Sequence, residues 1–115
     1  MPPSNPAGAD PRSGVLIESR PEVERTPPRS WRVLLHNDDY TTQEFVVWVL
    51  ETVFARSASE AMSIMLHVHH AGVGVAGVYT KEVAETKVAA TERLAEQHEF
   101  PLRVSMEPEP EEGKP

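Results

Sequence analysis

The sequence predicts a small α/β domain of the α+β kind, in which helices cover one face of a small antiparallel sheet. Two observations support this prediction. Segments with the period of strands and segments with the period of helices follow one another between Trp31 and Met106, in the order β-α-α-β-α-β. Prolines are frequent before and after this stretch, whereas Pro101 is the single proline inside it. Short strands mixed with longer helices favour one sheet with helices packed against it.

The first strand is predicted over residues 31–36, and a helix should follow a short turn. Thr41-Thr-Gln-Glu44 has the pattern of a capping box, with Thr41 as the N-cap and Glu44 at the third helical position. The buried face of this helix is predicted from apolar pairs that recur every four residues: 45/46, 49/50 and 53/54.

Ser57-Ala-Ser-Glu60 repeats the capping pattern and opens a second helix. Gly72 can end this helix in a left-handed conformation. The short connection between the two helices predicts an antiparallel hairpin. The apolar residues expected to line the second helix are Met62, Met65, Leu66 and Val68.

The remaining elements are a strand, a helix and a last strand. Residues 73–79 read as a strand whose two interior glycines indicate a bulge or a close backbone approach. Thr80 should cap a third helix that ends near His98, and apolar residues alternate with polar ones in a final strand from Leu102 to Met106. The buried face of the third helix is predicted to contain Val83, Val88, Ala90 and Leu94.

Length and composition limit the range of functions. The 115 residues suit one domain: a proline-rich flexible arm over residues 1–30, a core domain over 31–107, and a flexible acidic tail over 108–115. The formal net charge of −7 argues against nucleic acid as a partner. Cysteine is absent, which excludes disulfides and thiolate sites. With no apolar run longer than the six residues 45–50 and no signal peptide pattern, we expect a cytoplasmic protein that does not enter a membrane.

Three segments resemble the signature of the ClpS family of Clp protease adaptors. They are Asn37-Asp-Asp-Tyr-Thr41 followed by Glu44-Phe-Val46, Met65-Leu-His-Val-His69 with Gly72, and the run from Gly77 to Val88. The resemblance covers roughly Trp31 to Glu107 without an apparent gap. It implies the same order of elements, an adaptor rather than an enzyme, no cofactor, and a monomer.

The resemblance also implies a function and a set of site residues. Members of the family bind destabilising N-terminal residues (Leu, Phe, Tyr or Trp) of N-degron substrates and deliver them to a ClpAP-type AAA+ protease. The partner would be the N-terminal domain of a ClpA or ClpC-type unfoldase. By position, Asn37, Asp38 and His69 would contact the α-amino group and first peptide unit. Glu82 and Lys87 would face the unfoldase. The pocket for the first side chain would be formed by Asp39, Thr41, Gln43, Val46, Met65, Val68 and Leu102.

One position departs from the family pattern. A methionine is expected at the mouth of the pocket, where it helps to reject β-branched first residues, and this chain has Gln43. The ranking of first residues therefore stays open. The residue types predicted to contact the α-amino group do suit a cation, because a carboxylate, an amide carbonyl and a neutral imidazole are hydrogen-bond acceptors.

Two other functions compete with this interpretation. One is a metal site formed by His67, His69 or His70 together with Asp38 or Asp39, although the histidine spacing does not match the i, i+4 pattern of helical metal ligands. The other is a module that docks on the protease and has no substrate pocket. Metal content would test the first alternative, and peptide binding would test the second.

Overall fold

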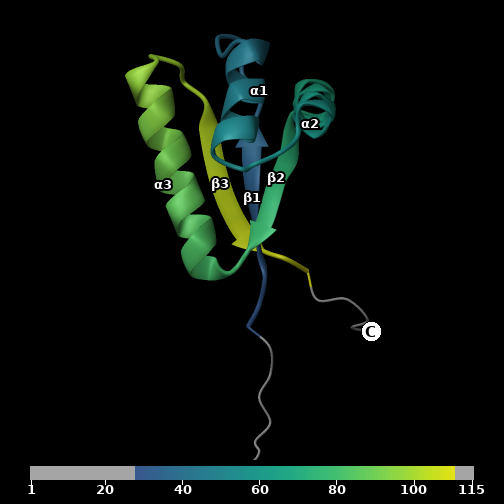
Figure 1. The fold of residues 1–115 in the computed structure, drawn as a ribbon, viewed down its shortest axis with the longest axis vertical. Helices are drawn as coiled ribbons and strands as arrows, with labels where there is room; N and C mark the ends of the chain where they lie inside the picture. The colour runs from purple at the N-terminus through teal and green to yellow at the C-terminus, as the bar shows by residue number, and fades with distance from the viewer. Residues whose placement is uncertain (1–27, 111–115) are drawn as a thin grey trace, which may run out of the picture.

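The computed structural model describes residues 28–110, which form three strands and three helices (Figure 1). The predicted α+β fold and the order β-α-α-β-α-β are confirmed. Along the chain, the elements are β1 (Trp31–His36), α1 (Gln43–Thr52), α2 (Ala58–Ala71), β2 (Val73–Tyr79), α3 (Lys81–Gln97) and β3 (Arg103–Pro108).

The sheet is antiparallel and has β1 at its centre, between β2 and β3. Its register pairs Trp31 with Tyr79 and His36 with Val73, so the end of β1 lies beside the start of β2. Alternate residues of β1 face in opposite directions, and Val33 and Leu35 are fully buried beneath the helices. The predicted irregularity in β2 is present as a shift of the register between Val33 and Leu34.

The helix starts follow the predicted capping chemistry with one correction. The N-cap of α1 is Thr42 and not Thr41; the Thr42 side chain accepts a hydrogen bond from the Phe45 N–H at 3.1 Å. The Thr41 hydroxyl is instead directed at Asp38, to which the Thr41 N–H also donates. Ser57 forms the complete capping box of α2, as predicted.

The two short helices cross instead of forming the predicted antiparallel hairpin. In Figure 1, α2 is seen almost end-on, whereas α1 lies in the plane of the view. In the connection between them, Ala55 adopts a left-handed conformation with φ of 55°. The predicted stop of α2 at Gly72 is confirmed by a φ of 92° and by a hydrogen bond from the Gly72 N–H to the Val68 carbonyl.

The crossing determines which predicted core residues are buried. In α2, Ala61, Met65 and Val68 face the core, while Met62 and Leu66 are exposed, contrary to the prediction. The prediction for the third helix is corrected in the same way at Val83, which is 42% exposed.

Helix α3 packs against all three strands through small side chains. Its buried residues are Ala84, Thr91 and Ala95, which bring the helix close to the sheet. The predicted Val88, Ala90 and Leu94 are partly buried at the margins of this contact. The core shared by all the elements includes Val33, Leu35, Phe45, Val49, Leu50, Phe54, Leu102 and Val104.

The predicted arm and tail fall largely on residues outside the described part of the chain, namely 1–27 and 111–115. At the boundary of the predicted tail, β3 continues to Pro108, and the Glu109 N–H donates to the Ser30 carbonyl at 2.8 Å. No helix within residues 28–110 is long and apolar enough to cross a membrane.

Gly74 provides a test of the packing between β2 and α2. A Cβ atom at this position would lie 2.8 Å from Val68 Cγ2 and 3.1 Å from His67 Cδ2, so these side chains, or the helix and strand that carry them, would have to shift. We expect Gly74→Ala to lower the free energy of unfolding by about 1–3 kcal/mol, measured by urea denaturation. The control is Val78→Ala on the exposed part of the same strand, with an expected loss of about 0.5 kcal/mol. Equal stability of the two variants would contradict the described packing.

Candidate binding site

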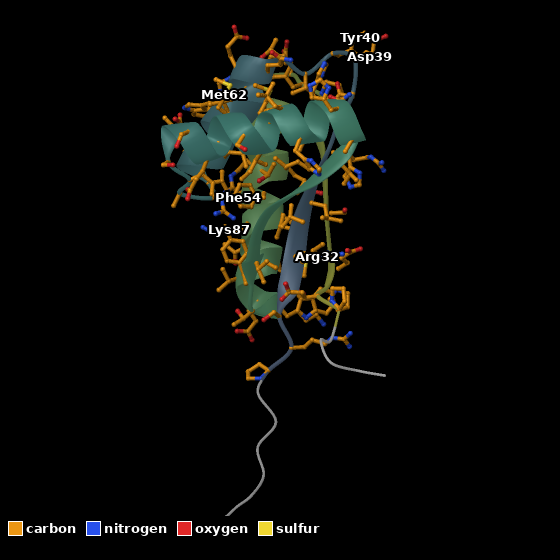
Figure 2. All side chains as sticks on the ribbon, turned by 90° about the vertical axis from the view of Figure 1, so that its right-hand side faces the viewer. Arg32, Asp39, Tyr40, Phe54, Met62 and Lys87 are labelled. Atoms are coloured by element: carbon orange, nitrogen blue, oxygen red, sulfur yellow. The ribbon has the colours of Figure 1, made fainter. Side chains whose placement is uncertain are left out.

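A cavity of about 200 Å³ opens where the end of β1 meets the C-terminal half of α2. The loop after β1 and the start of α1 form one side, and α2 forms the other. Figure 2 shows the labelled Asp39 and Tyr40 at this end of the domain, beyond the end of α2. The cavity is lined by Asn37, Asp38, Asp39, Thr41, Gln43, Val46, Met65, Val68 and His69.

Hydrogen bonds to Asp38 hold the loop between β1 and α1 in shape. Asp38 Oδ1 accepts from the N–H groups of Tyr40 and Thr41 at 2.8 and 2.7 Å, and Oδ2 accepts from the Thr41 hydroxyl at 2.7 Å. A further bond joins the loop to α2, because the Asn37 N–H donates to the carbonyl of Gly72 at 2.9 Å. This bond brings Asn37 and Asp38 next to the end of α2.

The same hydrogen bonds set the charge of Asp38. Burial alone raises the pKa of its carboxyl, but the bonds from the Thr41 hydroxyl, the Thr41 N–H and the Tyr40 N–H together lower the pKa below its ordinary value. Asp38 is therefore a carboxylate at neutral pH. A carboxylate has about four acceptor positions, and the loop uses three of them, so one remains for a ligand.

The end of α2 adds a second source of negative potential. The carbonyl groups in the last turn of a helix carry a partial negative charge, which favours a cation nearby. His69 lies in this last turn, is exposed, and packs edge-on against His70 with ring centroids 5.3 Å apart. A neutral imidazole at this position can offer an acceptor nitrogen to the cavity.

The floor of the cavity is apolar. Val46, Met65 and Val68 are 7%, 4% and 2% exposed, so their side chains belong to the hydrophobic core as well as to the cavity. An apolar cavity of about 150 Å³ can accept a benzene molecule. The volume of about 200 Å³ therefore suits one aromatic or branched aliphatic side chain.

Of the ten residues that the resemblance places at the α-amino group or in the side-chain pocket, nine line this cavity. Leu102 is the exception. It is 6% exposed, lies in the core just before β3, and is not among the residues that line the cavity.

The two residues expected to face an unfoldase lie elsewhere, on α3. Glu82 is exposed in the first turn of α3, which begins beside the Trp31 end of the sheet. Lys87 is partly buried; its Nζ donates to the Val53 carbonyl at 2.7 Å and lies 5.6 Å from the centre of the Tyr79 ring. Lys87 thus joins α3 to the end of α1, a structural role that the sequence did not reveal.

The competing metal-site interpretation finds no support in residues 28–110. No three His, Asp or Glu side chains in that range come together in a way that could hold a metal ion.

Sequence reasoning missed a second hollow between α1 and α2, next to the cavity. It is marked by two large apolar side chains that stay exposed, Trp48 at 39% and Met62 at 48%. No sequence pattern signals this exposure, because it depends on how the two helices cross.

Comparison with known proteins agrees with the fold and the motifs. Residues 26–105 match the family described as ATP-dependent Clp protease adaptor protein ClpS. A ClpS protein of Myxococcus xanthus is 56% identical over 97 residues, covering 84% of this chain and 91% of its own. A ClpS protein of Desulfatibacillum aliphaticivorans is 60% identical over 95 residues, covering 83% and 89%.

A solved structure gives the same result. Agrobacterium tumefaciens ClpS2 bound to L-phenylalaninamide superimposes with a TM-score of 0.69 at 38% sequence identity, covering 72% of this chain and all of that one. The family match spans more than half of the sequence, and the relatives are alike in sequence and in fold. The chain therefore belongs to the ClpS family of ATP-dependent Clp protease adaptor proteins.

Proposed function

We propose that the chain is an adaptor that holds the first residue of an N-degron substrate in the cavity and brings the substrate to an ATP-dependent Clp protease. The observation that carries this proposal is a cavity with an apolar floor and an anionic rim. The floor suits a bulky side chain such as Phe or Leu, and the rim suits the α-ammonium group of an uncapped chain. L-Phenylalaninamide, the ligand of the similar Agrobacterium structure, combines these two features.

In this proposal, the rim recognises the free amino group. The amino terminus of a peptide has a pKa near ~7.7–8.0, so it is mostly cationic at neutral pH. Asp38 would accept one of its N–H bonds through the unused carboxylate position, and the Asn37 carbonyl and His69 nitrogen would accept others. Hydrogen bonds to charged groups contribute about 1.5–3 kcal/mol each. Together with one buried side chain, they must exceed the entropy cost of association, so we expect micromolar affinity or tighter.

The two faces of the adaptor would be separate. The cavity lies at the His36 end of β1, and the start of α3 lies at the Trp31 end, about 20 Å away for a strand of this length. A substrate in the cavity and an unfoldase domain on Glu82 would therefore not compete. We propose the N-terminal domain of a ClpA or ClpC-type unfoldase as the partner at α3.

The function is tested by comparing a peptide that begins with Phe with the same peptide carrying an N-terminal acetyl group. Acetylation removes the charge and leaves acceptors unpaired, at about 1–3 kcal/mol for each, so we expect affinity to fall tenfold or more. Fluorescence anisotropy measures both dissociation constants. Asp38→Asn should lower the affinity for the peptide with a free N-terminus about tenfold. The control, Glu92→Gln, makes the same charge change on the exposed surface of α3 and should leave this affinity unchanged. Equal affinity for free and acetylated peptides would refute the proposal.

A second prediction separates the two residues on α3. Glu82→Gln should weaken binding to the unfoldase domain and leave the free energy of unfolding nearly unchanged, because Glu82 is exposed. Lys87→Ala should weaken binding to the unfoldase domain too. In addition it should lower the free energy of unfolding by about 1 kcal/mol, because the Val53 carbonyl loses its donor. Calorimetric titration and urea denaturation measure the two effects, with Glu85→Gln on the same helix as the control. If the Glu82→Gln variant bound the unfoldase domain as tightly as the unaltered protein, Glu82 would not be part of the interface.

A further inference from the structure

A groove of about 330 Å³ adjoins the cavity and has no role in the function proposed above. It lies between α1 and α2 and shares two residues, Gln43 and Met65, with the cavity. Figure 2 shows Met62, which lines the groove, on the same end of the domain as Asp39 and toward the opposite end of α2. The groove and the cavity are therefore neighbours along α2, with Met65 between them.

The distance between the two hollows matches a few residues of an extended chain. His69 follows Met62 by seven positions (69 − 62) in α2, which is about 10 Å at ~1.5 Å per residue. An extended peptide advances ~3.3 Å per residue. A chain whose first residue occupies the cavity and which leaves along α2 would reach the groove about three residues later, at its fourth residue.

The groove has an aromatic wall that is held in place. The Trp48 ring packs against Phe45, with centroids 5.7 Å apart, and edge-on against His98 at 5.2 Å. Trp48 nevertheless remains 39% exposed, and Met62 faces it from α2 with 48% exposure. A rigid indole face beside a flexible methionine can receive a long side chain with an apolar stem.

The rim of the groove is negatively charged. Glu44 and Glu51 both line the groove. Glu44 precedes Trp48 by four residues and Glu51 follows it by three, so all three side chains lie on one side of α1. Within residues 28–110, neither carboxylate forms a salt bridge. An arginine side chain fits all three features, because its stem packs on methionine and its planar guanidinium stacks on tryptophan and pairs with carboxylates.

We propose that this groove is a second subsite, which binds an arginine side chain about three residues after the first residue of the substrate. The proposal rests on the proposed function of the cavity, since the cavity fixes the start of the bound chain. The adaptor would thereby read a short pattern, a bulky first residue followed by a basic one.

The test measures dissociation constants by anisotropy for peptides that begin Phe-Ala-Ala-Ala and for variants with arginine at the second, third or fourth position. We expect arginine to tighten binding about fivefold at one or more of these positions, with the largest gain at the fourth; a fivefold gain is about 1 kcal/mol. The double variant Glu44→Gln/Glu51→Gln and the single variant Trp48→Ala should each remove this gain. Neither variant should abolish binding of the Phe-Ala-Ala-Ala peptide that lacks arginine.

Controls keep the outcomes distinct. The double variant Glu85→Gln/Glu92→Gln makes the same charge change on exposed positions of α3 and should keep the gain from arginine. The Gln variants also guard against misfolding, which Trp48→Ala could cause through its contacts with Phe45 and His98. No gain from arginine, or a gain that survives the groove variants, would overturn the subsite while leaving the proposed function intact. If the Phe-Ala-Ala-Ala peptide itself did not bind, both the subsite and the proposed function would be overturned.

Discussion

The geometry of the site depends on one backbone hydrogen bond, from the Asn37 N–H to the Gly72 carbonyl. This bond joins the end of β1 to the end of α2, so that a polar loop and a helix terminus meet around one cavity. Gly72 can occupy this corner because its φ of 92° is accessible to glycine at little cost. Gly74, just beyond it, has no Cβ and thereby lets Val68 approach the strand. The small residues at this corner bring the acceptors of the rim within reach of one ligand.

Around this corner, the charges are arranged for a cation. Asp38 keeps its negative charge because three hydrogen bonds from the loop outweigh the effect of burial on its pKa. The C-terminal end of α2 adds a partial negative charge from the other side. The formal net charge of −7 has the sign that would attract a cationic ligand at longer range. A side chain that binds the apolar floor without an ammonium group would gain from none of these features.

Much of this arrangement could be predicted from the sequence, and the errors have physical causes. The strands, the helices and the stop at Gly72 follow from local patterns, and nine cavity residues follow from the family resemblance. The sequence pattern places the N-cap one residue early because either threonine can cap, and in the structure the Thr41 hydroxyl bonds to Asp38 while Thr42 caps the helix. The exposure of Met62 depends on the crossing of α1 and α2, a tertiary property that periodicity does not contain. The same holds for the contact between Lys87 and the Val53 carbonyl.

The most direct test of this account is a titration of the ¹⁵N-labelled protein with L-phenylalaninamide, followed by the amide resonances in NMR spectra. The account predicts the largest changes at the N–H groups of Asn37, Tyr40 and Thr41, whose bonds shape the site, and in the last turn of α2. The acetylated compound, N-acetyl-L-phenylalaninamide, should produce almost none. Changes centred on α3, or equal changes with the acetylated compound, would contradict it.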